Sequence, residues 1–527
     1  MNSSRSVILS ALISVCLVLS CGETDGISSS SVSISEIRST IRFLGDDLLE
    51  GRAPGTRGGR LAENYIRGVF ELLDIAPYRG SYFQEFTLRG HTMRRLSVTL
   101  AGENISYEKD VMGTYVGKDQ SFSLQGEVVF AGFGITSEPF SWDDYGDVDV
   151  RDKIVIVRVN EPGRDDSDLF EGDALTYFGR WTYKIEEAAR RGARGILLIH
   201  TTDSAGYGWQ VVRNSWAGEE LYLPSALDNN LLFRGWIREK KLKKVLAAEG
   251  ISLEELYRKS ESREFNPVKL GITAGMEGGA EWREFTARNV TGFIPGTDRK
   301  LKNRSIILSA HIDHLGIKSS VKGDSIFNGA IDNGSAVATM IAAAKALVEQ
   351  RDKLKYSVIV LACNAEEAGL LGSRYFAGSL NPEEIVADIN FESTPVWEKT
   401  TDFIAVGARY SDLEDIIREI LKERNLEYSY FSMSNQGFFY RSDQFSFARR
   451  GIPSVWLSAG EDYTGGVNRL REFFLGNYHT VDDEFDPGWK LESTLQTVEV
   501  TLDLINYLNS RNQALEWKGR MTFPVEK

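Results

Sequence analysis

Short apolar runs alternate with longer amphipathic stretches from residue 284 onward. The short runs are typical of buried strands, and the longer stretches have the hydrophobic spacing of helices. Strands are predicted at Val290–Ile294, Ile306–Ala310, Ser357–Cys363, Ile385–Phe391, Phe403–Val406 and Pro453–Leu457. Helices are predicted at Ser335–Gln350, Ser411–Arg424 and Leu491–Asn509. This alternation predicts an α/β/α sandwich around a mixed, mostly parallel sheet.

Two regions with a less regular pattern of apolar and polar residues precede residue 284. Residues 36–105 carry two helical signals around a loop rich in Gly and Pro, and we assign them to the same domain. Residues 106–280 have strand signals, a helix and a further strand, with a loop-like stretch at 203–230, so we expect a smaller inserted α/β domain there. The main domain then resumes at 281–515 and ends in a C-terminal tail at 516–527. The signals in these two regions are Ile37–Leu49, Glu63–Leu73, Gly126–Phe130, Lys153–Val159, Lys184–Arg191 and Gly195–His200.

The composition is that of a folded protein with more than one domain. The chain has 527 residues, of which 42% are hydrophobic and 26% are charged. A chain of this length builds two or three domains rather than one core. Its net charge is −14. Because nucleic-acid binding requires a basic face, this charge argues against a nucleic-acid partner.

The first residues have the pattern of an export signal. Arg5 precedes the apolar run Val7–Leu19, which is too short for a permanent membrane span. Val18-Leu19-Ser20-Cys21 resembles a bacterial lipobox. We therefore expect a signal peptide at 1–20 and export to the cell envelope, with the membrane contacted only through a lipid anchor on Cys21. A signal that is cleaved without lipidation is the alternative.

Serine-rich residues follow this signal, and residues 21–35 are predicted to form a flexible tether. Cys16 would leave with the signal and Cys21 would carry the lipid. Only Cys363 then remains, inside an apolar run, so we expect a buried thiol and no internal disulfide.

Polar side chains follow three predicted strands at the point where each strand ends. His311-Ile312-Asp313-His314 follows the strand at 306–310, Asn364-Ala365-Glu366-Glu367 follows the one at 357–363, and Glu392 follows the one at 385–391. Open α/β sheets bind ligands at the carboxyl ends of their strands, so these side chains are expected at one edge. Histidines mixed with carboxylates suit Zn²⁺, with Mn²⁺ or Co²⁺ as competitors. One histidine for each ion and a shared carboxylate suit a two-metal site.

Several sequence blocks resemble the M28 family of metallopeptidases. These blocks are Ser309–Gly316, Asn328–Ser335, Glu366–Ser373, Ser442–Gln444, Gly451–Pro453 and Tyr478–Thr480. Residues 51–66 resemble the start of the family domain. Val129–Ile135 and Asp152–Val155 resemble the protease-associated domain that some members insert, here at 106–280. The resemblance implies a zinc-exopeptidase-like fold.

The resemblance also implies the metal ligands. His311 and Glu392 would bind the first ion, Asp332 would bridge both, and Glu367 and His479 would bind the second, which gives two Zn²⁺ per chain. Most family members have Asp where this chain has Glu392. Because Glu reaches one methylene further, it can still ligate the ion after a small shift.

The remaining roles concern catalysis and the backbone. The resemblance makes Glu366 the general base that activates a bridging water. It places Asp313 behind His311, where the carboxylate would fix the tautomer of the imidazole. It further implies a cis peptide bond between Asp332 and Asn333. His314 precedes Leu-Gly, and we interpret it as a structural residue in a turn.

These roles predict a dinuclear zinc exopeptidase that acts on peptides, and an aminopeptidase is the first hypothesis. A carboxypeptidase of the same family and a glutaminyl cyclase are the enzymatic alternatives. A receptor-like protein that binds without catalysis is a further one, although the complete ligand set argues against it. The side-chain preference and the oligomeric state stay open.

Overall fold

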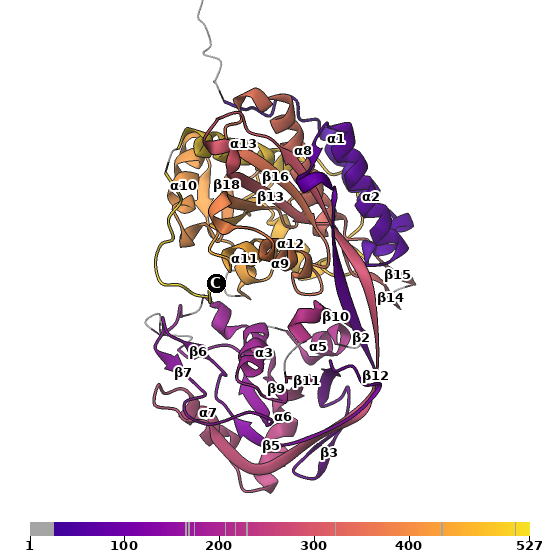
Figure 1. Ribbon diagram of the computed structural model, residues 1–527, viewed down its shortest axis with the longest axis vertical. Helices are drawn as coiled ribbons and strands as arrows, with labels where there is room; N and C mark the ends of the chain where they lie inside the picture. The colour runs from indigo at the N-terminus through magenta and orange to yellow at the C-terminus, as the bar shows by residue number, and fades with distance from the viewer. Residues whose placement is uncertain are drawn as a thin grey trace, which may run out of the picture.

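Two long antiparallel strands, β2 (Phe83–Leu100) and β12 (Val268–Ile294), run along one side of the molecule and join an upper lobe to a lower lobe (Figure 1). The computed structural model describes residues 26–526, apart from 164–165, 167–168, 173, 206, 217, 228–229, 322, 434–435 and 512. The predicted signal peptide and Cys21 lie outside these residues. None of the described helices is long and apolar enough to cross a membrane.

The upper lobe is built on a mixed, mostly parallel sheet, as the alternation of apolar runs predicts. Its order is β19-β18-β20-β17-β13-β16-β12, and β13 runs parallel to both β16 and β17. Only β18 against β20 and β12 against β16 are antiparallel pairs within this order. Its remaining strands are β13 (Ser305–His311), β16 (Ser357–Cys363), β17 (Ile385–Asn390), β18 (Asp402–Val406), β19 (Glu427–Ser429) and β20 (Ser454–Ala459).

Both faces of this sheet are buried, which explains why its strands are continuously apolar. Ile306 and Leu308 of β13 pack into the core on one face, and Ile307 packs into a separate core on the other. One face carries α1 (Ile34–Leu44), α2 (Arg57–Leu72), α8 (Ala336–Glu349), α10 (Leu413–Glu423) and α13 (Glu492–Ser510). The other face carries α9 (Leu371–Gly378) and α11 (Gln444–Ala448), while α12 (Arg469–Gly476) packs near the outer strands. The predicted α/β/α sandwich is confirmed.

The lower lobe continues the same hydrogen-bonded path from β12 but has its own cores. Val98 and Leu100 of β2 belong to one of these cores, so the lobe begins before residue 106. The expected loop at 203–230 contains two helices and a strand that pairs with β2. The elements of this lobe are β4 (Val111–Tyr115), β5 (Ser121–Phe130), β8 (Ile154–Arg158), α3 (Trp181–Arg190), β9 (Gly195–His200), α4 (Thr202–Ala205), α5 (Trp209–Ser215), β10 (Glu219–Tyr222), β11 (Phe233–Arg238), α6 (Glu239–Ala248) and α7 (Leu253–Ser260).

Short elements complete the chain. The short strands are β1 (Ala76–Pro77), β3 (Glu103–Ile105), β6 (Thr136–Ser137), β7 (Trp142–Asp143), β14 (Gly316–Val321) and β15 (Asp324–Phe327). Three short helical turns are used below, namely η1 (Asp47–Arg52), η6 (Ala330–Ser335) and η11 (Phe438–Tyr440).

An aromatic cluster joins the two lobes. Phe178 and Tyr183 of the lower lobe share this cluster with Tyr440 and Phe445 of the upper lobe, and Phe523 of the C-terminal segment packs into it. The C-terminus accordingly lies between the lobes in Figure 1. Residues 516–526 are therefore part of the contact between the lobes.

The described part of the predicted tether is packed rather than flexible. Ile27 is buried, and its amide donates a hydrogen bond to Asn506 Oδ1 at 2.8 Å. The Ser28 amide donates to Gln350 Oε1. These contacts, which a serine-rich composition does not reveal, hold residues 26–28 against the upper lobe. Cys363 is a buried free thiol, as expected.

Candidate metal centre and active site

Parallel pairing brings the polar residues together at one edge of the upper sheet. His311 is the last residue of β13 and lies level with Cys363, the last residue of β16. Glu366 and Glu367 follow in the next loop, and Glu392 lies two residues beyond the end of β17. The expectation that these strand ends converge is therefore confirmed by the sheet register.

His311 lies at the centre of the first group of side chains. Its Nε2 is 3.3 Å from Asp332 Oδ1, 3.4 Å from Glu392 Oε1 and 3.8 Å from Glu366 Oε2. Its Nδ1 lies 3.1 Å from the backbone carbonyl of Asp313. A carbonyl only accepts, so Nδ1 carries the proton and the lone pair of Nε2 points at the carboxylates.

Asp313 differs from the expectation in how it acts. Its carboxylate is 3.8 Å from His311 Nδ1, so the contact that fixes the tautomer comes from its backbone carbonyl. The carboxylate accepts hydrogen bonds from the amides of Glu366 at 3.0 Å and Glu367 at 3.3 Å. Asp313 thus positions the loop that carries both glutamates, which makes it a positioning residue.

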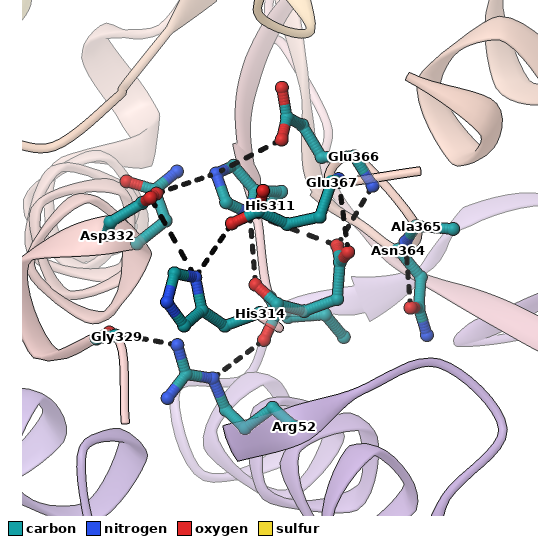
Figure 2. A network of polar contacts seen from close by, with 12 residues as sticks. Arg52, His311, His314, Gly329, Asp332, Asn364, Ala365, Glu366 and Glu367 are labelled. Carbon is teal, nitrogen blue, oxygen red and sulfur yellow. Dashed lines mark hydrogen bonds and ion pairs between the residues drawn. The ribbon is translucent and has the colours of Figure 1, made fainter. Parts of the chain in front are cut away.

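A second group forms around Glu367. His479 Nε2 lies 3.1 Å from Glu367 Oε2 and 3.2 Å from Asp332 Oδ2. His314 Nδ1 lies 2.7 Å from Glu367 Oε1 and 3.8 Å from Asp332 Oδ2. Asp332 therefore faces His311 with one oxygen and His479 with the other, which is the position expected of a bridging carboxylate. Figure 2 shows His311, His314 and Glu367 converging beside Asp332.

His314 is the residue of this centre that the sequence interpretation missed. It was interpreted as a turn residue, yet it is buried and faces two of the predicted ligands. The signal was present in the His-x-Asp-His spacing. His314 follows the last residue of β13 by three positions, and its imidazole lies beside Glu367 at the same edge of the sheet.

Several ligand atoms are buried without a hydrogen bond, which fits a bound cation. His314 Nδ1, Asp332 Oδ2, Glu367 Oε1 and His479 Nε2 belong to this set. Buried polar atoms normally find partners, and an unpaired set that faces inward indicates a metal position. Geometry alone separates two candidate triads, His311 with Glu366 and Glu392, and His314 with Asp332 and Glu367. The donor set of imidazoles and carboxylates suits Zn²⁺.

The electrostatics favour a positive ion at the same place. Burial raises the pKa of Glu366 well above its usual range, and the neighbouring Glu392 and Glu367 raise it further against the opposite effect of His311. Burial opposes the charged form of His479, but Glu367 and Asp332 outweigh it and raise the pKa of His479 to about 10. Such a local excess of negative charge attracts cations.

Surrounding side chains hold the ligands in place. Asp483 accepts hydrogen bonds from the amides of Ile331 and Asp332 at 2.8 and 3.0 Å, which fixes the η6 turn. The Ser442 hydroxyl donates to Glu392 Oε2 at 2.5 Å. The peptide bond between Asp332 and Asn333 is cis, as the resemblance implies.

Arg52 supports the centre from behind. Its buried guanidinium donates to backbone carbonyls on both sides of the site, including Ile312 and Gly329 at 2.9 Å each (Figure 2). The loop that contains Arg52 was predicted from its Gly and Pro content. Its contact with residues almost 300 positions away is a tertiary feature.

The fold and the site together define an α/β protein with a candidate metal centre at the carboxyl edge of its sheet. Residues 289–504 match the model of a family described as Peptidase family M28. The matched part of the chain contains all the predicted ligands. No curated protein matches the chain.

Solved structures with a related fold include aminopeptidases. An aminopeptidase from Aneurinibacillus sp. strain AM-1 aligns over 95% of this chain and 98% of its own, with 18% identity and a TM-score of 0.52. A zinc aminopeptidase from Bacillus subtilis aligns over 92% and 95%, with 16% identity and a TM-score of 0.43. An M28 peptidase precursor from Shewanella amazonensis SB2B aligns over 92% and 96%, with 17% identity and a TM-score of 0.45. The first of these supports the fold assignment across both lobes.

Proposed function

We propose that the protein is a zinc-dependent exopeptidase, and specifically an aminopeptidase that removes N-terminal residues from peptides. One observation carries the proposal. Asp332 faces a histidine on each side, within two groups of buried ligand atoms at the carboxyl edge of the sheet. The match of residues 289–504 to the model of Peptidase family M28 supports the reaction class.

Two ions would be held by the predicted ligands, with His311 and Glu392 on one side of Asp332 and Glu367 and His479 on the other. His314 is a further ligand candidate for the second position. Zinc bound here would supply Lewis acidity, polarising the scissile carbonyl and making a water molecule more acidic.

Glu366 is the proposed general base. Its side chain is 10% exposed, lies on the loop fixed by Asp313, and comes within 3.8 Å of His311 Nε2. A carboxylate at this place can take a proton from the attacking water and deliver it to the leaving amine.

The lower lobe and the N-terminus complete the proposal. We propose that the lower lobe is a protease-associated domain that restricts access by folded proteins. The contact of this lobe with the upper lobe through the aromatic cluster around Tyr440 and Phe445 supports this role.

We further propose that the protein is exported and anchored by a lipid on Cys21. Metabolic labelling with a palmitate analogue tests the anchor, and labelling that survives Cys21→Ala would refute it.

The decisive experiment is a peptide panel on zinc-loaded protein whose metal content is measured by elemental analysis. An aminopeptidase cleaves peptides with a free amine and spares their N-acetylated forms. Cleavage from the carboxyl end would indicate a carboxypeptidase, and cyclisation of N-terminal glutamine with release of ammonia would indicate a glutaminyl cyclase. If a protein with two zinc ions modifies no member of the panel, the proposal fails.

A further inference from the structure

Basic residues gather at the amino-terminal edge of the upper sheet, opposite the metal centre. They lie on two loops, residues 296–304 before β13 and residues 350–355 before β16. These loops carry seven basic residues against two acidic ones, although the whole chain has a net charge of −14. The basic residues are Arg299, Lys300, Lys302, Arg304, Arg351, Lys353 and Lys355. Glu383 and Glu384, in the turn before the neighbouring strand β17, bound this positive surface on one side.

Hydrogen bonds hold the two loops together as one surface. The Thr297 amide donates to the Leu354 carbonyl at 2.8 Å, and the Ser357 amide donates to the Arg304 carbonyl at 3.1 Å. The Ser357 hydroxyl donates to the Lys302 carbonyl at 2.7 Å. These bonds fix the backbones of both loops beside each other. Residues 296–304 and 350–355 therefore form one continuous surface, which we call the basic edge.

The charges of the basic edge are mostly free of internal ion pairs. Of its seven basic residues, Arg351 alone forms an ion pair within the described part of the chain, at 3.2 Å from Asp74. Five of the others are exposed, namely Arg299, Lys300, Lys302, Lys353 and Lys355. In the lower lobe, by contrast, Lys241 of α6 pairs with Glu103. The basic edge can therefore meet an external anionic surface without breaking internal ion pairs, and its charge favours such a partner.

The described chain begins against the basic edge. Lys353 Nζ donates to the Gly26 carbonyl at 2.9 Å, and Gln350 Nε2 donates to the Ser28 carbonyl at 2.7 Å. In Figure 1 the indigo start of the described chain lies at the end of the upper lobe that points away from the lower lobe. The proposed lipid site, Cys21, precedes Gly26 by five residues, which span at most about 18 Å. A lipid on Cys21 would therefore bring the basic edge to the surface of the membrane.

The metal centre lies at the other end of the same strand. β13 begins at Ser305, directly after the basic edge, and ends at the predicted ligand His311. Six residue steps along a strand span about 20 Å. A membrane that contacts the basic edge would therefore leave the metal centre facing the aqueous side, from which soluble peptides arrive.

We propose that the basic edge binds an anionic lipid surface and orients the metal centre away from it. Anionic headgroups give a membrane a negative surface potential, and each Lys or Arg near such a surface strengthens binding about fivefold. This contact goes beyond the proposed lipid anchor, because the folded surface itself makes it. Only the reach from Cys21 depends on that anchor, whereas the charge and exposure of the basic edge do not.

The test is co-sedimentation with lipid vesicles. The protein is used from residue 22 onward, which keeps every described residue and removes the predicted signal and the lipid site. Vesicles of pure phosphatidylcholine are compared with vesicles that also contain phosphatidylglycerol, which is anionic. We expect binding to the anionic vesicles to be at least about 100-fold tighter at low salt. Because salt screens exposed charges, this binding should weaken steeply between about 0.1 M and about 1 M salt.

Paired substitutions locate the contact. Lys302→Glu with Lys355→Glu changes two exposed side chains of the basic edge and should weaken binding to the anionic vesicles at least about 30-fold. Lys240→Glu with Lys244→Glu, on the exposed side of α6, changes the net charge equally and is the matched control. Because these residues lie on the lower lobe, the control should leave binding within about twofold.

Amide hydrogen exchange on the vesicle-bound protein tests the orientation. Residues 296–304 and 350–355 should gain protection while α6 stays unchanged, and protection confined to other segments would refute the orientation.

Three binding results overturn the inference. They are equal or absent binding to both kinds of vesicle, a loss of binding in the α6 variant but not in the basic-edge variant, and tighter binding of polyglutamate than of the anionic vesicles. The last result would assign the basic edge to an acidic polymer. Circular dichroism identifies folded variants, and Arg299→Glu with Lys300→Glu replaces the first pair if that variant does not fold. Since the measurement needs neither turnover nor lipidation, failure of the proposed peptidase function or of the Cys21 anchor leaves its result unchanged.

Discussion

The sharpest prediction concerns Arg52, which is 1% exposed and holds the back of the metal centre. Its guanidinium donates to the carbonyls of Leu44, Ile312, Asn328 and Gly329. The Ile312 carbonyl lies between the predicted ligand His311 and Asp313, and Gly329 precedes the turn that presents Asp332. We predict that Arg52→Met destabilises the upper lobe and weakens zinc binding.

The magnitude follows from two opposing contributions. Hydrogen bonds to a charged group are worth about 1.5–3 kcal/mol each, so the four together contribute roughly 6–12 kcal/mol. Burial lowers the pKa of Arg52 to about 10, a penalty of about 3 kcal/mol for the charged form. The hydrogen bonds therefore outweigh the burial penalty. Replacing Arg52 with an apolar side chain of similar length should lower the free energy of unfolding by about 3 kcal/mol or more.

Urea unfolding followed by circular dichroism in excess chelator measures this loss without the contribution of metal. Competition with a chromophoric chelator then measures zinc affinity, which should fall at least about tenfold because the ligand loops lose their common support. Arg60→Met on the exposed side of α2 is the matched control and should change neither quantity appreciably. A loss of stability below about 1 kcal/mol in Arg52→Met would show that the carbonyls find other partners and would refute the reasoning.

Three further predictions follow from the same geometry. Glu366→Gln should retain both zinc ions by elemental analysis yet lower kcat by several orders of magnitude, and near-normal turnover would remove Glu366 from the role of base. Asp332→Ala should lose metal at both positions, because one carboxylate serves both; two retained equivalents of zinc would contradict the bridging assignment. Burial raises the pKa of the Glu63 carboxyl to about 7 because the folded state favours the uncharged form. The stability that this preference contributes is fully present below the ordinary pKa of 4.5 and is lost as the pH rises through 7. Glu63→Gln should therefore reduce the stability difference between pH 5 and pH 8 by about 2 kcal/mol in urea unfolding, and an unchanged difference would exclude this role.

The sequence alone determined the architecture of the upper lobe and most of its candidate site. Strands buried on both faces are short, continuous apolar runs, so β13, β16 and β17 stand out against amphipathic helices. Parallel strands end at one edge, so the polar residues directly after them had to converge, which places His311 near Glu392. These inferences depend only on local pattern and on the geometry of parallel sheets.

Contacts between distant segments were decided only by the tertiary structure. The pattern of Gly, charged and apolar residues in β2 and β12 does not disclose strands long enough to run through both lobes. The backbone that follows β13 brings His314 beside Glu367, and a single sequence does not fix that direction. Arg52 acquires its role from carbonyls on segments far away in the chain. Local hydrophobic periodicity specifies which face of an element is buried, whereas only the packing of complete elements determines which polar groups meet.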